Sequence, residues 1–156
     1  MAIFLLMLSC SKEGEGFKDL KWGMSPAEVK QQVGWQDSYF SEQQVNLNAK
    51  GLNVIEGVNA KHAKAQFKEG KLVGVWLELD ASSKEDFQNI GKLRDLLSKK
   101  YGPISGNEIK DGVLATWKDE TVSLIISTSG GPIFLIYRDP TFVQFVKEKE
   151  LRYNAK

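Results

Sequence analysis

The sequence is poor in the residues that build disulfides and metal sites. Its 156 residues include one cysteine, Cys10, and one histidine, His62. A single cysteine excludes an internal disulfide and a thiolate cluster, and a single histidine excludes a site with several histidine ligands. No serine lies in a GxSxG motif, so the nucleophile elbow of many hydrolases is missing. We therefore expect no catalytic site, no metal site and no cofactor.

An excess of charge of one sign is also lacking. Lysine and arginine total 21 against 20 aspartate and glutamate residues, which gives a net charge of +1. Proteins that bind nucleic acid usually carry a basic stripe or patch, so a nucleic-acid partner is not expected. The sequence also has no polybasic cluster that would hold a domain against anionic lipid. With 42% hydrophobic and 26% charged residues, the composition is typical of one folded domain with a core.

An unbroken apolar run occupies the N-terminus, from Ala2 to Leu8. It is too short to cross a bilayer, which takes about 20 apolar residues, and it fits the hydrophobic region of a secretory signal. The segment Met7-Leu8-Ser9-Cys10 that ends the run resembles the lipobox of bacterial lipoproteins. This resemblance implies a lipid on the Cys10 sulfur, cleavage before Cys10, and acylation of the new amino group. Several acyl chains would satisfy the requirement of stable anchoring.

The N-terminal features predict three segments and a location. Residues 1–9 form a signal peptide, residues 10–16 a lipidated tether of mostly small and charged residues, and residues 17–156 a single α+β domain. The expected location is the bacterial cell envelope, with the domain facing the periplasm or the exterior and attached to the membrane by the lipid on Cys10. The alternative is an N-terminal strand or helix in the core, with Cys10 as an inert buried thiol.

Three helix patterns follow. Ser25-Pro26-Ala27-Glu28 combines an N-cap, a proline at the first helical position and a capping box, and this helix is expected to end at Gly34. A second helix is capped by Ser82 or Ser83 and ends before Gly102-Pro103. Its core-facing stripe is Phe87, Ile90, Leu93, Leu97 and Tyr101. A last helix begins at Asp139-Pro140, and its expected apolar side is Phe142, Phe145, Val146 and Leu151.

Alternating residues predict the strands between these helices. His62 to Lys68 alternates cleanly, Glu69-Gly70 forms a hairpin turn and Leu72 to Leu79 is the return strand. The further expected strands are Val113–Lys118, Thr121–Thr128 and Ile133–Arg138, with weaker ones in Gln43–Asn48 and Gly51–Gly57. The predicted class is α+β, with an antiparallel sheet of about six strands and helices on one face. The order helix-strands-helix-strands-helix, with an echo of Lys64–Lys68 in Leu114–Lys118, suggests a pseudo-repeat.

The same alternation divides the sheet into two faces. Val73, Val75, Leu77 and Leu79 would take the helix-covered face, which sends Trp76 to the other. The candidate binding residues on that second face are Trp76, Leu114, Ile125, Phe134, Ile136 and Arg138. If helices cover only one face, these residues form an exposed apolar patch with a polar rim, which is typical of an interaction site. The alternative is a face covered by the N-terminal segment, by the last helix or by a second copy in a homodimer.

Short motifs spread over the body resemble those of a loose group of bacterial exported proteins. They are Leu20–Ser25 with Glu28-Val29, Phe67–Leu72, Lys100–Pro103, Thr116-Trp117 and Ile136-Tyr137. The arrangement is similar to the beta-lactamase-inhibitor-protein-like fold, which includes small outer-membrane assembly lipoproteins. The resemblance implies protein binding or assembly and no catalysis. We therefore expect a membrane-anchored, non-enzymatic module with a protein partner. The alternatives are a secreted or periplasmic hydrolase with an unrecognised site and a purely structural envelope protein.

Overall fold

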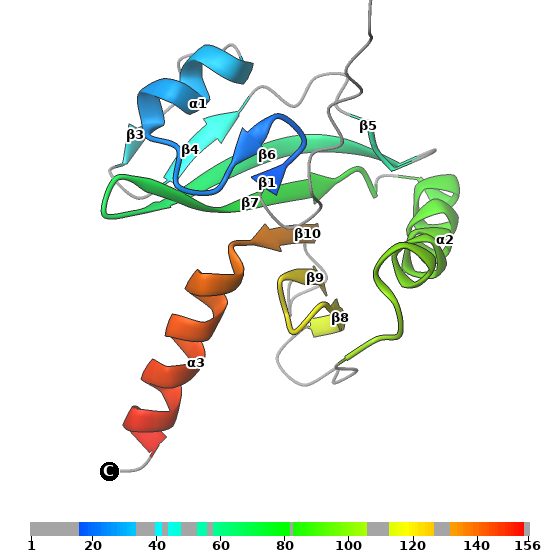
Figure 1. Ribbon diagram of the computed structural model, residues 1–156. Helices are drawn as coiled ribbons and strands as arrows, with labels where there is room; N and C mark the ends of the chain where they lie inside the picture. The colour runs from blue at the N-terminus through cyan, green and yellow to red at the C-terminus, as the bar shows by residue number, and fades with distance from the viewer. Residues whose placement is uncertain are drawn as a thin grey trace, which may run out of the picture.

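The computed structural model describes most of the body of the chain. The described residues are 16–33, 40–41, 44–47, 53–55, 58–81, 83–105, 113–126 and 132–154. The signal-like run and the lipobox-like segment with Cys10 lie outside these residues. The helices are α1 (Pro26–Val33), α2 (Lys84–Tyr101) and α3 (Pro140–Asn154) (Figure 1).

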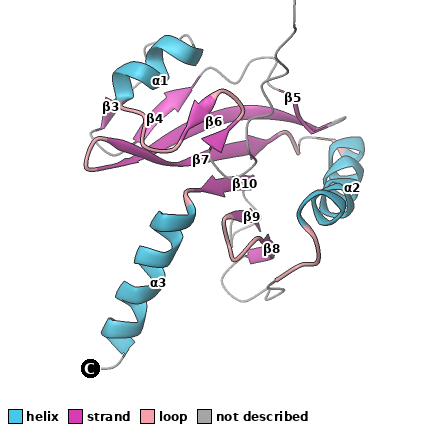
Figure 2. Ribbon diagram, viewed as in Figure 1, coloured by secondary structure: helices cyan, strands magenta, loops and turns pink. Residues whose placement is uncertain are grey.

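The strands are antiparallel wherever they pair. Their bounds are β1 (Gly16–Phe17), β2 (Leu20–Lys21), β3 (Phe40–Ser41), β4 (Gln44–Leu47), β5 (Asn53–Ile55), β6 (Val58–Lys68), β7 (Lys71–Leu79), β8 (Val113–Trp117), β9 (Val122–Ile126) and β10 (Ile133–Arg138) (Figure 2). The main sheet has the order β3-β4-β6-β7-β10-β9-β8, with β5 paired to β6, and β1 pairs with β2 in a separate hairpin. Six strands in the described residues are at least four residues long. The predicted α+β class and antiparallel sheet are confirmed.

Two strand meanders meet at the centre of this sheet. The first ends in β7 and the second ends in β10, and these two final strands pair with each other from Leu79 opposite Ile133 to Gly74 opposite Arg138. A pseudo-two-fold repeat would give such an arrangement. The two similar segments do not occupy equivalent strands in it, because Lys64–Lys68 lies on β6, beside the central pair, whereas Leu114–Trp117 lies on β8 at the outer edge.

All three described helices begin directly after a residue predicted as their cap, namely Ser25, Ser83 and Asp139. The Ser25 backbone N–H donates to Glu28 Oε2 at 2.7 Å, and the Glu28 N–H donates to Ser25 Oγ at 3.3 Å, which completes the capping box. The Ser25 backbone N–H, and then its hydroxyl, lower the pKa of Glu28. At the start of α3 the Thr141 N–H donates to Asp139 Oδ1 at 2.9 Å. Side-chain oxygens thus satisfy N–H groups that the first helical turn leaves unpaired.

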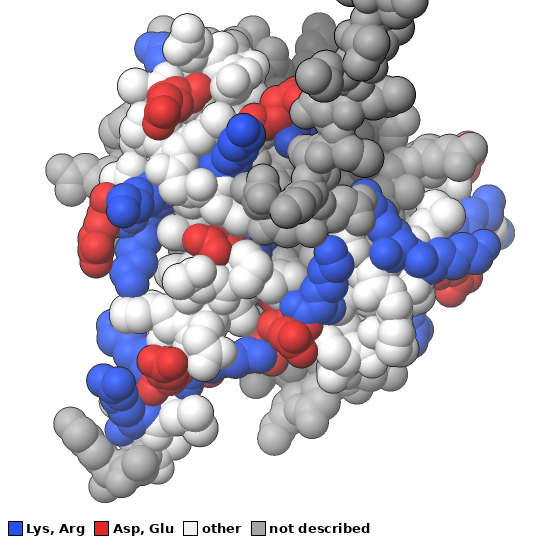
Figure 3. All heavy atoms as spheres, in the orientation of Figure 1, with Lys and Arg blue, Asp and Glu red and all other residues white. Residues whose placement is uncertain are grey.

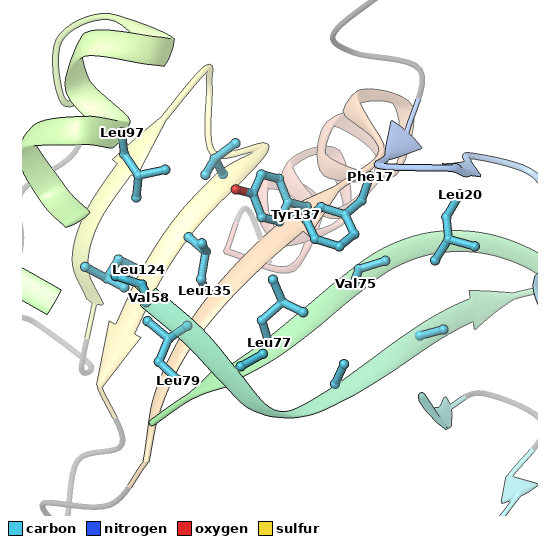
Figure 4. Packing of buried hydrophobic residues seen from close by; sticks show 14 of the residues in the cluster. Phe17, Leu20, Val58, Val75, Leu77, Leu79, Leu97, Leu124, Leu135 and Tyr137 are labelled. Carbon is cyan, nitrogen blue, oxygen red and sulfur yellow. The ribbon is translucent and has the colours of Figure 1, made fainter. Parts of the chain in front are cut away.

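The hydrophobic core joins α1, α2 and the β1-β2 hairpin to the strands. Figure 4 shows Leu97 of α2 and Phe17 and Leu20 of the hairpin beside the strand residues. The helices contribute Val29, Ile90, Leu93 and Leu97, all of them buried. Phe17 of the hairpin stacks against Tyr137 of β10 with ring centroids 4.7 Å apart, and the fully buried Trp117 donates from Nε1 to Ser98 Oγ at 3.1 Å. These contacts confirm the core-facing residues Ile90, Leu93 and Leu97 of the second helix; the side chain of Phe87 lies outside the described part of the structure.

A β-bulge corrects one of the predicted faces. Gln66 lies opposite Gly74 and Phe67 lies opposite Leu72, so Val73 is the extra residue on β7. A bulge of this kind shifts the alternation of the strand by one residue. Leu72 consequently belongs to the hydrophobic core, whereas Val73 is buried outside it. The assignment of Val73 to the core face by simple alternation was wrong.

Helix α3 extends away from the end of the sheet (Figure 1). It contacts the end of β6 and the turn that follows β8: Lys68 Nζ lies 2.9 Å from the ring centroid of Phe145, and Lys147 Nζ lies 3.2 Å from Glu120 Oε1. Phe145 is nevertheless 43% exposed and Leu151 is 71% exposed. Phe145 and Leu151, which were predicted on the apolar side of the last helix, are thus largely exposed, and the buried residue of α3 is Val143.

Candidate binding face

Strand register brings the predicted face residues together. Trp76 of β7 lies opposite Ile136 of β10, and Phe134 of β10 lies opposite both Glu78 of β7 and Ile125 of β9. Directly opposed residues project to the same side of a sheet. The described residues that share this side, here called the candidate face, are His62, Lys64, Gln66, Gly74, Trp76, Glu78, Thr116, Ser123, Ile125, Phe134, Ile136 and Arg138.

Leu114 was also predicted on this side. It is the extra residue of a bulge on β8, because Val113 lies opposite Ile125 and Ala115 lies opposite Leu124. The register therefore gives the place opposite Ile125 to Val113. The side chain of Leu114 lies outside the part of the chain that the structure describes.

Burial corrects the picture of a broad exposed patch. Ile136, at the centre of the candidate face, is 0% exposed, and its neighbour Ser123 is 2% exposed. Trp76, Ile125, Phe134 and Arg138 are half-buried. Among the predicted residues whose side chains the structure describes, these four have surface with which to contact a ligand. The large apolar side chains with the greatest exposure among the described residues are instead on α3, and they are Phe145, Leu151 and Tyr153.

Trp76 is fixed by two contacts on the candidate face. Its indole Nε1–H donates to Gln66 Oε1 at 3.2 Å. Its ring meets Phe134 edge-on, with centroids 6.0 Å apart and an interplanar angle of 68°. This geometry is one that aromatic pairs favour, because the positive edge of one ring meets the negative face of the other. The two rings therefore form an ordered aromatic surface across the central strand pair.

Arg138 borders the aromatic pair. Its Nη1 donates to Ser123 Oγ at 3.0 Å and to the backbone carbonyl of Glu120 at 3.3 Å, and its guanidinium carbon lies 6.0 Å from the Trp76 ring centroid. Burial lowers the pKa of Arg138, and the charge of Glu120 acts in the opposite direction. The group remains charged because arginine does not lose its proton in proteins.

Gln66 and Gly74 belong to the site although they were not among the predicted binding residues. Gly74 lies between Gln66 on β6 and Arg138 on β10. A Cβ at Gly74 would lie 3.4 Å from Gln66 Oε1 and 3.3 Å from the Tyr137 carbonyl. The glycine thus leaves space beside the amide that holds Trp76. A glycine inside an apolar strand is a sequence signal for such a close approach.

One further polar residue on this side of the sheet is His62. It is exposed on β6 opposite Glu78, as its alternation predicted. Among the described residues no group of three histidine, cysteine or carboxylate side chains could hold a metal ion. None of the helices within the described ranges is both long and apolar enough to span a bilayer. Basic and acidic side chains intermingle over the visible surface (Figure 3).

Comparisons with family models, curated proteins and solved structures gave no match for the chain.

Proposed function

We propose that the protein is a lipid-anchored, non-enzymatic module of the bacterial cell envelope that binds a protein partner on its candidate face. The observation that carries the binding role is the half-buried pair of Trp76 and Phe134 beside Arg138. Tryptophan and arginine are the residue types most enriched among those that dominate protein interfaces. Their occurrence together on one face supports a protein ligand over a purely structural surface.

The order of the aromatic pair favours binding. Association costs about 0.5–1.5 kcal/mol for each side chain that must be immobilised. Trp76 is already held by Gln66 at 3.2 Å and by the ring of Phe134, so little of this cost remains for it. Ile136 and Ser123 are buried at the centre of the face. They give the half-buried side chains a packed base on the neighbouring strands β10 and β9.

The anchoring part of the proposal comes from the N-terminal sequence. The apolar run followed by Met7-Leu8-Ser9-Cys10 fits a signal peptide with a lipid acceptor. Each buried CH₂ of an acyl chain contributes about 0.8 kcal/mol to membrane affinity. An acylated Cys10 would hold the domain at a membrane surface, where a partner in the same envelope is present at high local concentration.

Site-specific photo-crosslinking tests the proposal. A photoreactive phenylalanine analogue is placed at Phe134 of the full chain in intact cells, with the same analogue at Tyr153 as a matched control, because Tyr153 is 83% exposed on α3. The proposal predicts an adduct with a different protein at position 134, little at position 153, and a weaker adduct when Trp76→Ala or Cys10→Ala is added.

Two outcomes contradict the proposal. An adduct of twice the mass of the chain would show that the face closes a homodimer and would favour a structural role. Equal adducts at positions 134 and 153, or none at 134, would show that the candidate face is not the binding surface.

A further inference from the structure

The guanidinium group of Arg138 is held by one nitrogen only. Both of its hydrogen bonds, to Ser123 Oγ and to the Glu120 carbonyl, come from Nη1. Nε and Nη2 make no hydrogen bond within the described part of the chain. In a guanidinium, the Nε–H and one Nη2–H point in the same direction along one edge. This edge matches the two oxygens of a carboxylate and gives a bidentate pair.

The charge of Arg138 lacks a close anionic partner. The nearest candidate, Glu120, presents its carbonyl to Arg138, and its carboxylate pairs with Lys147 at 3.2 Å. No carboxylate in the described residues lies within salt-bridge distance of Arg138. The charge of Glu120 acts on Arg138 only from beyond salt-bridge distance. The cost of the half-buried cation is therefore only partly offset, and an incoming anion would lower what remains.

The surroundings of Arg138 also define the shape of a suitable ligand. Trp76 lies beside the guanidinium, and Gly74, opposite Arg138, adds no side chain of its own. Glu78 lies four residues beyond Gly74 on β7, which is about 13 Å at 3.3 Å per residue. Lys64, exposed on β6 opposite Trp76, adds a second positive charge to the face. An anion is therefore favoured near Arg138 and Trp76 rather than beside Glu78.

We infer that Arg138 receives a carboxylate of the protein partner through its Nε and Nη2 edge, while an adjoining apolar group of the partner packs on Trp76. The inference deepens the proposed function and rests on it. The recognised element is an acidic side chain or a chain terminus next to an apolar residue. Ser123 and the Glu120 carbonyl act as positioning groups, since they fix Nη1 and so orient the opposite edge.

A small-molecule probe tests this binding directly in the full chain. Benzoate is titrated into the ¹⁵N-labelled protein while the Nε–H signals of its three arginines, Arg94, Arg138 and Arg152, and the indole N–H signals are followed by NMR. The inference predicts saturable shifts of the Arg138 Nε–H and of the Trp76 indole N–H. Benzamide, which has the same ring without the charge, should bind at least about 10-fold more weakly, as expected for hydrogen bonds between charged groups.

Variants separate a bidentate site from a nearby charge. Arg138→Gln should weaken benzoate binding by about 10-fold or more, and Arg138→Lys should recover little of it because lysine has no planar fork. Arg94→Gln is the matched control, because Arg94 is exposed on α2, and it should leave the affinity unchanged. Circular dichroism checks that each variant is folded. The benzoate titration of the wild-type chain tests the inference even if a variant does not fold.

The result that overturns the inference is a benzoate titration that leaves the Arg138 Nε–H in place, or one that moves Arg94 and Arg152 equally. Tighter binding of inorganic phosphate than of benzoate would also overturn it, since the site would then select phosphate. These failures differ from failure of the proposed function. If the Arg138→Gln variant crosslinks a partner at position 134 with the same yield, the proposed binding role stands and only the inference of a carboxylate ligand fails.

Discussion

Two residues on the same strand face provide a strict test of which part of the candidate face is core. Phe134 and Ile136 lie two positions apart on β10 and project to the same side. Ile136 is 0% exposed, whereas Phe134 is half-buried. Replacing each residue in turn by alanine should therefore destabilise the fold to different extents.

The expected magnitudes follow from burial. Ile136→Ala removes three carbons from a fully buried side chain, which costs about 2.4 kcal/mol at about 0.8 kcal/mol per carbon, and the cavity raises the loss to about 3 kcal/mol. Phe134→Ala removes a larger side chain that is already partly solvated. Its expected cost is about 1–2 kcal/mol, of which the edge-on contact with Trp76 accounts for about 0.5–1.5 kcal/mol.

The assay is urea denaturation of the full chain with Cys10→Ala as the background, followed by circular dichroism. Equal m-values in the two variants would show that only stability has changed. The expected difference between the two free energies of unfolding is about 1–2 kcal/mol. A cost for Phe134→Ala equal to or above that for Ile136→Ala would refute the reasoning, because it would make Phe134 a core residue with no surface to offer a ligand.

Three further substitutions or titrations test local features. Asp119 lies in a turn where it and both of its neighbours have positive φ. Glycine adopts this backbone conformation more easily, so Asp119→Gly should stabilise the fold by about 0.5–1 kcal/mol in thermal unfolding. A loss of stability would show that the backbone at Asp119 is not strained. Ser98→Ala should cost about 1–2 kcal/mol in urea denaturation, since it leaves the buried Trp117 N–H unpaired; no loss would contradict that bond. Ser25 lowers the pKa of Glu28 from 4.5. The contribution of ionised Glu28 to the stability of the fold is therefore present above the pKa of the unfolded state and is lost as pH falls through the pKa of the folded state. Ser25→Ala removes the hydroxyl and keeps the backbone N–H, so NMR titration should show the Glu28 pKa rising part of the way to 4.5. An unchanged pKa would show that the Ser25 hydroxyl does not lower it.

Local signals in the sequence predicted much of the fold. The capping box at Ser25 and the cap at Asp139 each depend on residues within three positions, and both hydrogen bonds are present. The turn at Glu69-Gly70 has positive φ at both residues, 51° and 71°, as the hairpin motif requires. Such features are predictable because the interacting groups are close in the chain.

Features that depend on distant partners were not predictable in the same way. Val73 and Leu114 are extra residues of bulges, and a single inserted residue reverses an assignment made by alternation. The burial of Ile136 depends on side chains from neighbouring strands that the sequence does not show to be adjacent. The direction of α3 depends on contacts with the end of β6 and with the turn that follows β8, and the contact between Lys147 and Glu120 joins residues 27 positions apart.

The most direct test of the candidate face is a footprint of Trp76 in the native envelope. Hydroxyl-radical labelling, read by mass spectrometry, compares Trp76 in intact cells with Trp76 in the purified full chain, and Tyr153 on α3 serves as the internal reference. Binding on the candidate face predicts that labelling of Trp76 falls several-fold in cells relative to Tyr153. Equal relative labelling in the two settings would contradict the account, because Trp76 would then be uncovered where the protein works.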